Sequence, residues 1–194
     1  MRQLHRNTKR GSSSPRDSRI PHFNAWRKTP NPLQVAGMAN WLMKSEPEVY
    51  SIDDFRKDQR TLWTGVRNYQ ARNFMMADHP TAMKLGDEFI FYHSNAEPPA
   101  AVGLGRIIRL SVPDPEQFQK KSEYFEARAT KAKPIWFCAE VEYVRHFTRA
   151  VSLEQMRGEK TLAKLELLKR GTRLSIFPIS RAEFEQILRM GSGD

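Results

Sequence analysis

Side chains that could hold a nucleobase and its phosphate are concentrated between Trp63 and Phe74. The indole of Trp63 offers a flat face for stacking, and the guanidinium of Arg67 is a planar fork of donors that suits a phosphate. Asn68 is a favoured N-cap residue and predicts a short helix over residues 69–76, whose first N–H groups would add to an anion site. The same pattern is equally compatible with apolar core residues that flank a loop.

Polar side chains also gather where two predicted strands end. They are Lys44, Ser45 and Glu46 in one group and Tyr92, His93 and Ser94 in the other. A serine, a histidine and a glutamate can form a nucleophilic set, but no nucleophile elbow surrounds these residues. A flipped or free base needs only stacking faces and a few placed donors and acceptors. The residue types therefore favour a ligand pocket, and no catalytic residue is assigned.

The composition excludes several classes of site. Cys138 is the one cysteine in the sequence, so the chain can form neither an intramolecular disulfide nor a thiolate metal cluster. Its apolar neighbours in a predicted strand indicate a buried small hydrophobe. The histidines are scattered without ligand spacing, and no glycine-rich phosphate loop is present, so we expect no metal and no cofactor.

The positive charge is unevenly distributed along the chain. Residues 1–37 hold eight Lys and Arg and one Asp, a charge of +7, so residues 38–194 carry the remaining +3 of the total of +10. We expect a disordered basic tail over 1–37, upstream of a true start at Met38, an ordered domain over 38–190 and a flexible C-terminus over 191–194. The near-neutral domain favours a local binding cleft over a broad basic surface.

The patterns of the ordered part predict an α+β fold built on a small curled antiparallel sheet. Strands are expected over residues 39–44, 88–95, 101–110, 135–147 and 173–179, a leucine-rich helix over 161–170, and an extended loop over 113–133. Capping boxes at Ser51, Ser152 and Ser180 predict three further helix starts. No apolar run could cross a bilayer and no secretory signal follows the basic N-terminus, so we expect a soluble monomer, cytoplasmic, nucleoid-associated in a bacterium or nuclear in a eukaryote.

Four motifs in order give the chain a specific resemblance to the EVE domain family. They are Trp41–Pro47, Gly65–Phe74, Phe91–Asn95 and Arg173–Pro178. The resemblance implies a PUA-like fold, a curled antiparallel β-barrel with short helices around it, related to the YTH domain. It also implies a non-enzymatic reader of modified bases in DNA or RNA.

The resemblance also implies which residues form the pocket. Carried over position by position, they are Lys44, Ser45, Glu46, Pro47, Trp63, Thr64, Gly65, Val66, Arg67, Asn68, Tyr92, His93, Ser94, Ser175 and Pro178. Lys44, Arg67 and Arg72 are expected to hold flanking phosphates. Many family members have Asp where this chain has Thr64, and a hydroxyl can donate as well as accept, so the preferred base need not be the same.

Two other functions fit the same residues. One is an enzyme acting on a modified base or nucleotide, with His93 or Glu46 as acid or base. The other is a sensor of a free small heterocycle, whose affinity would not depend on salt. If the chain is a base reader that stacks the base on Trp63, replacing Trp63 with Ala should remove roughly 1–3 kcal/mol of stacking energy.

Overall fold

The computed structural model describes residues 39–193, and the expected basic tail lies outside them. Its strands are β1 (Asn40–Ser45), β2 (Arg60–Leu62), β3 (Glu88–His93), β4 (Ala100–Pro113), β5 (Phe137–Ser152) and β6 (Ile176–Ile179). Its α-helices are α1 (Ile52–Asp58), α2 (Tyr69–Phe74), α3 (Leu153–Gly158) and α4 (Arg181–Ser192). Short 3₁₀ turns cover Pro115–Phe118, Lys160–Leu162 and Glu166–Leu168. The fold is α+β, as expected.

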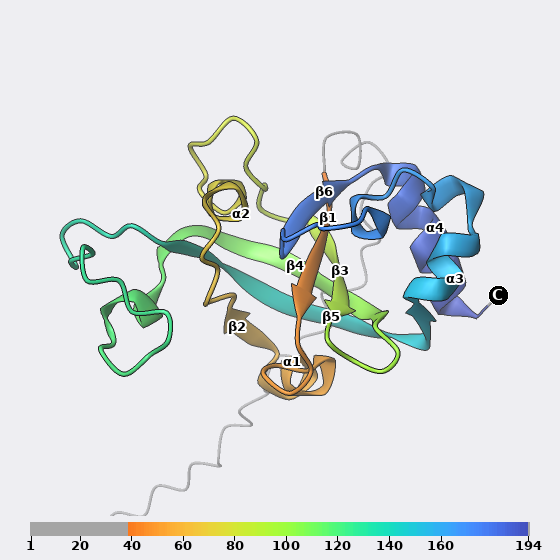
Figure 1. Ribbon diagram of the computed structural model, residues 1–194, viewed down its shortest axis with the longest axis horizontal. Coiled ribbons are helices and arrows are strands. Elements are labelled where there is room, and N and C mark those ends of the chain that lie inside the picture. The colour runs from red at the N-terminus through yellow and green to blue at the C-terminus, as the bar shows by residue number, and fades with distance from the viewer. Residues whose placement is uncertain (1–38, 194) are drawn as a thin grey trace, which may run out of the picture.

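The six strands form one mixed sheet in the order β2-β5-β4-β3-β1-β6 (Figure 1). The prediction of a purely antiparallel sheet is wrong, because β1 and β3 pair in parallel, with Leu42 opposite Ile90. A parallel pair needs a long crossover between its strands, and the connection from β1 to β3 carries α1, β2 and α2. The other four pairings are antiparallel. Closure into a barrel and the relation to the YTH domain stay predictions.

Local helix signals are confirmed at all three capping boxes. Ser51 caps α1 with Asp54, Ser152 caps α3 with Gln155, and Ser180 caps α4 with Glu183. Each serine oxygen accepts from the backbone three residues on, while the partner side chain accepts from the serine N–H. Helix α4 continues through Ser192, beyond the expected domain end at residue 190, and its Gly191 is buried against the ring of Phe147.

The leucine-rich helix predicted over residues 161–170 is wrong. The segment instead forms two separate 3₁₀ turns, in which Ala163 N–H donates to Lys160 C=O and Leu168 N–H donates to Leu165 C=O. Its leucines at 162, 165 and 168 recur every three residues, a spacing that either a 3₁₀ turn or an α-helix places on one face. Leu162 and Leu165 are buried at these turns. Strand β2 was not predicted, β5 runs further than expected and β6 begins later.

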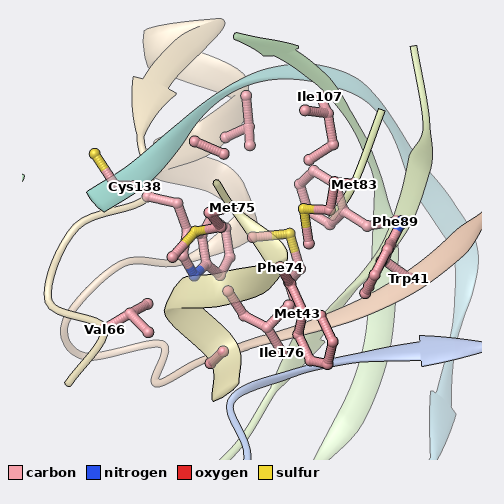
Figure 2. Close-up of a cluster of buried hydrophobic side chains, with 14 of the residues drawn as sticks. Trp41, Met43, Val66, Phe74, Met75, Met83, Phe89, Ile107, Cys138 and Ile176 are labelled. Atoms are coloured by element: carbon pink, nitrogen blue, oxygen red, sulfur yellow. The ribbon is translucent and has the colours of Figure 1, made fainter. Parts of the chain in front are cut away.

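Two hydrophobic cores lie on opposite faces of β1, because successive residues of a strand point to opposite sides. The first core contains Trp41, Phe55, Trp63, Phe89 and Phe91, and Figure 2 shows part of it. The second core contains Leu42, Ile90, Phe177 and residues of α3 and α4. These two helices lie together at one end of the molecule, and the loop between β4 and β5 lies at the other (Figure 1).

Close packing explains the two glycines of β4. A side-chain Cβ at Gly105 would lie 2.2 Å from the Phe89 ring, and one at Gly103 would lie 2.5 Å from the Arg145 carbonyl oxygen. The β4 backbone therefore lies too close to its neighbours at both positions for a side chain to fit. Among residues 39–193, no helix is both long and apolar enough to cross a membrane.

Candidate ligand pocket

A cavity of about 790 Å³ opens where β1, β3 and β6 meet the turn after β2. This volume suits a drug-sized or nucleotide-sized ligand. It brings together eleven of the fifteen pocket residues expected from sequence: Lys44, Ser45, Glu46, Trp63, Thr64, Gly65, Val66, Arg67, Asn68, Ser94 and Ser175. It is also lined by residues that sequence reasoning missed, namely Val49, Tyr50, Thr61, Leu62, Glu123, Tyr124 and Arg173.

One side of the cavity, here called the strand-end wall, consists of residues 44–50 with Ser94 and Ser175. Backbone bonds join its pieces: Lys44 N–H donates to Ser175 C=O at 2.8 Å, and Ser94 N–H donates to Ser45 C=O at 2.9 Å. The Ser45 hydroxyl donates to the Tyr50 carbonyl oxygen at 2.8 Å. Since that hydroxyl proton is directed to a carbonyl group and not to a base, this geometry does not resemble an activated nucleophile.

Within the strand-end wall, the turn after β1 closes on Glu46. The N–H groups of Val49 and Tyr50 both donate to its carbonyl oxygen, each at 2.9 Å. The Glu46 carboxylate accepts from the Asn95 side-chain amide at 2.7 Å. The turn is therefore fixed by bonds within residues 45–50 and by the bond from Asn95, and it presents Val49 with 73% of its surface exposed at the cavity.

Lys44 is the cation of the strand-end wall. It is half-buried, and burial lowers the pKa of its amine. Within residues 39–193, no carboxylate pairs with it. An amine partly removed from water is stabilised by a nearby anionic group, which is the condition that a bound phosphate would meet.

Trp63 borders the cavity from the first core. Only 7% of its surface is exposed, and its ring meets Phe89 and Phe91 edge-on at centroid distances of 5.6 and 5.4 Å. Its backbone N–H donates to the Ala139 carbonyl oxygen at 2.8 Å. The indole is therefore both a lining residue and a part of the core, with little free face. Thr64, next along the chain, is exposed.

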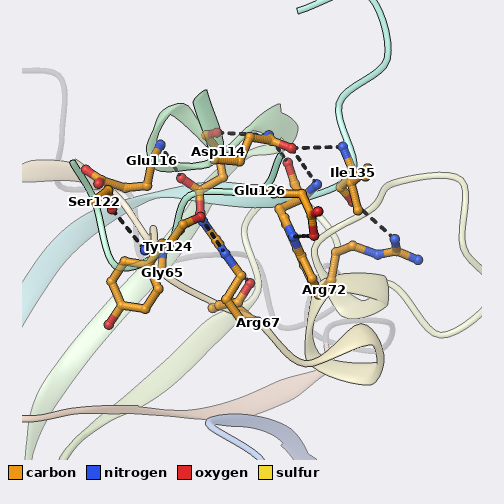
Figure 3. Close-up of polar contacts among 12 residues, drawn as sticks. Gly65, Arg67, Arg72, Asp114, Glu116, Ser122, Tyr124, Glu126 and Ile135 are labelled. Carbon is orange, nitrogen blue, oxygen red and sulfur yellow. Dashed lines mark hydrogen bonds and ion pairs between the residues drawn. The ribbon is translucent and has the colours of Figure 1, made fainter. Parts of the chain in front are cut away.

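A second part of the lining, here called the loop wall, consists of the turn Gly65–Arg67 and the loop residues Glu123 and Tyr124. The buried carboxylate of Asp114 holds the turn: its Oδ2 accepts from Gly65 N–H at 3.0 Å and from Arg67 Nη1 at 2.7 Å (Figure 3). Arg67 also donates from Nε and Nη2 to the Tyr124 carbonyl oxygen. One arginine thus links the turn to the loop.

The side chain of Gln117 stabilises the same loop by hydrogen bonds to its backbone. Its amide nitrogen donates to the carbonyl oxygens of Asp114 and Trp136, at 2.9 and 2.7 Å. Its amide oxygen accepts from the N–H groups of Ile135 and Trp136, at 2.8 and 2.9 Å. Gln117 is fully buried and all four bonds are made, so the two ends of the loop are tied together.

The prediction that the first N–H groups of α2 are free to bind an anion is wrong. Asn68 does cap the helix, but its Oδ1 accepts from both Gln70 N–H and Ala71 N–H, so these groups are not free. Arg72 donates to Asn73 Oδ1 and to the Ile135 carbonyl oxygen. The forks of both arginines expected to bind phosphate, Arg67 and Arg72, are therefore engaged within the protein.

Four expected pocket residues do not line the cavity. Tyr92 is 2% exposed in the second core, and Pro178 pairs with Trp41 in the sheet. His93 accepts from Ile52 N–H through Nε2 at 3.1 Å, and burial lowers the pKa of its imidazole. Pro47 lies in the turn beside the lining residues. His93 therefore has a structural partner away from the cavity, so only Glu46, of the two acid or base candidates of the enzyme hypothesis, lines the cavity.

Sequence signals for the missed lining residues are weak. Tyr124 lies in the charged segment over 113–133 that was interpreted as a loop, and an aromatic side chain in such a segment was the one available sign of a role. Cys138 is buried and burial raises the pKa of its thiol to about 12, so the expectation of a buried small hydrophobe is confirmed.

Comparisons with known proteins agree on one family. The model of the EVE domain matches residues 39–190. The chain is 36% identical over 170 residues to human thymocyte nuclear protein 1, covering 78% of this chain and 73% of that protein. It is 38% identical over 169 residues to the mouse protein of the same name, covering 77% of this chain and 72% of that protein.

Solved structures show the same likeness in three dimensions. A hypothetical protein from Leishmania major superposes with a TM-score of 0.75 at 39% identity, covering 81% of this chain and 97% of that one. The human THYN1 protein in complex with DNA containing 5-methylcytosine superposes with a TM-score of 0.72 at 36% identity, covering 80% of this chain and 99% of that one.

Proposed function

Since this chain belongs to the EVE domain family, we propose that it binds DNA carrying a modified base and holds that base between the strand-end wall and the loop wall. The human relative that is similar over most of both chains was crystallised with 5-methylcytosine DNA, and this is the observation that carries the proposal. A cavity of about 790 Å³ accommodates one extruded base.

The lining chemistry supports binding without catalysis. Hydroxyl and carboxylate groups on both walls and the nearby Asn68 amide can meet the edge of a base, and Lys44 offers a positive charge for the backbone. The Ser45 hydroxyl donates to a carbonyl group, and only Glu46, of the two acid or base candidates, is a lining residue. We therefore place the protein among non-enzymatic readers, within the PUA-like grouping that the family resemblance implies.

The test compares otherwise identical duplex and single-stranded oligonucleotides with cytosine or 5-methylcytosine at one position. The full chain is titrated at two salt concentrations. We expect tighter binding to the modified strand at both salt concentrations. For each phosphate contacted, log K should fall by about 0.9 per unit of log[salt] in the duplex and by about 0.7 in the single strand. Equal affinity for all oligonucleotides would reject the proposal.

The same titration separates the other candidate functions. A heterocycle sensor would bind 5-methylcytosine as a free base with an affinity independent of salt. An enzyme would convert the modified oligonucleotide on prolonged incubation, which mass spectrometry of the recovered strand would detect. RNA carrying the same modification is the final arm, because the pocket residues alone do not distinguish the two sugars.

A further inference from the structure

The residue expected to stack on the base has little surface left for it. Trp63 is 7% exposed, and both Phe89 and Phe91 pack edge-on against its ring. A base held in the cavity still needs an aromatic face to replace the stacking that it loses when it leaves the duplex. Another aromatic residue must therefore supply that face if the proposed function holds.

Tyr124 is the aromatic residue of the loop wall, and it is partly exposed at the cavity. It lies against Gly65, where an added Cβ would come within 3.0 Å of two of its ring carbons. Gly65 also has a φ of +79°, a conformation that other residues rarely adopt. The glycine thus allows the turn to approach the tyrosine ring closely.

Arg67 fixes the position of Tyr124. The guanidinium carbon lies 5.1 Å from the centroid of the Tyr124 ring and 5.3 Å from that of Trp136, so the cation contacts both aromatic rings. Two of its nitrogens bond the Tyr124 carbonyl oxygen, and a third bonds Asp114, which is 1% exposed. A ring held in this way loses little conformational entropy when a ligand stacks on it.

The tyrosine hydroxyl also remains a donor in this setting. Burial raises the pKa of Tyr124, and the carboxylates of Glu123 and Glu46 raise it further. Glu46 belongs to the strand-end wall, so its field reaches Tyr124 across the cavity. A protonated phenol beside a flat ring can both stack on a base and donate to it.

We propose that Tyr124 provides the stacking face for the bound base, and that Arg67 and Asp114 are positioning residues that hold this face opposite the strand-end wall. This inference rests on the proposed function. It gives Arg67 a role in building the pocket in place of the phosphate contact expected from sequence.

The test measures binding of the full chain to the 5-methylcytosine oligonucleotide and to its unmodified twin. Tyr124→Ala should weaken binding of the modified strand roughly 5- to 150-fold, the loss of one base–aromatic stack, and bring it near the affinity of the unmodified strand. Tyr124→Phe should recover most of that loss because it keeps the ring. Tyr124→Leu, which keeps bulk without a π-face, should not.

Phe125→Ala is the matched control. Phe125 is the next residue, is aromatic and is 40% exposed, but it does not line the cavity, so its removal should leave the preference for the modified strand unchanged. Thermal unfolding of every variant shows whether the fold is intact. Wild-type affinity in Tyr124→Ala, or an equal loss in Phe125→Ala, would overturn the inference while the proposed function stands.

Arg67→Lys separates positioning from phosphate contact. Lysine keeps the charge but cannot reproduce the fork that bonds both Tyr124 and Asp114. If Arg67 positions the ring, the variant should lose affinity for the modified strand with an unchanged slope of log K against log[salt]. If the variant keeps wild-type affinity and slope, the positioning role is refuted. If wild-type protein shows no preference for the modified strand, the proposed function itself has failed.

Discussion

The strand-end wall and the loop wall face the same cavity, but the turns within them are held by different kinds of contact. In the strand-end wall, Ser45 bonds Tyr50 five residues away, and the N–H groups of Val49 and Tyr50 close on Glu46. In the loop wall, Arg67 bonds partners 47 and 57 residues away, and the structure depends on the buried carboxylate of Asp114.

This difference predicts how much stability is lost when a residue of each wall is substituted. In the strand-end wall, several hydrogen bonds of small individual free energy hold the turn, so the turn should stay in place when one of them is lost. The loop wall is organised around two buried polar side chains, Asp114 and Gln117, whose partners would be left unsatisfied in a low-dielectric interior. Substitutions in the loop wall should therefore cost more free energy of unfolding than those in the strand-end wall.

The largest effect is expected for Asp114→Ala, at about 3–5 kcal/mol of unfolding free energy, because it leaves the largely buried Arg67 guanidinium without its partner. Denaturant titration measures this loss. Glu116→Ala is the control, since the Glu116 side chain is in no ion pair within residues 39–193 and should change stability by no more than about 0.5 kcal/mol. Equal losses in the two variants would break the contrast between the walls.

Gln117→Ala should cost about 1–3 kcal/mol, because removal of the buried amide unpairs backbone groups at both ends of the loop. Hydrogen exchange should show faster exchange at Ile135 and Trp136, whose N–H groups lose their acceptor. Gln119→Ala, in the same segment, should leave those two amides protected. Unchanged protection in Gln117→Ala would show that the loop is held by other contacts.

Ser45→Ala should cost only about 1 kcal/mol, the net value of one ordinary hydrogen bond, because the turn keeps its bonds to Glu46. The same denaturant titration applies. A loss above about 3 kcal/mol would mean that the strand-end wall, like the loop wall, depends on a single group, and the comparison would fail.

The smallest effect is expected in the pH dependence of stability. Burial lowers the pKa of His93 below its ordinary value of 6.5, with a raising contribution from Asp53 and a lowering one from His146. A depressed folded-state pKa means that the unfolded chain binds more protons, so the stabilisation is complete above pH 6.5 and is lost as the pH falls below it.

Thermal unfolding from pH 8 to pH 5 checks this sign. His93→Gln, which keeps an acceptor for Ile52 N–H, should show a flatter profile than wild type. His79→Gln is the control for loss of a histidine, because within residues 39–193 the His79 side chain bonds only Thr81, two positions on. A steeper profile in His93→Gln than in wild type would contradict the assignment.

Several parts of the fold and pocket could be predicted because their signals are local. The caps at Ser51, Ser152 and Ser180 each depend on a residue three positions on. The first part of the strand-end wall, residues 44–46, likewise follows from a short run of polar residues where a strand ends. By contrast, the 3₁₀ turns of residues 160–168 were misread as a helix, since apolar spacing alone does not separate the two forms clearly.

The sequence by itself determined the family, the α+β class, the helix starts and residues 44–46 of the strand-end wall, because their signals lie within short runs of the chain. Only the tertiary structure decided that β1 and β3 run parallel, that Trp63 is buried and that Tyr124 borders the cavity. These features depend on contacts between segments roughly fifty residues apart, as between Arg67 and Tyr124. Such contacts form only when folding of the sheet brings the two distant segments together, and patterns within a short stretch of sequence do not predict them.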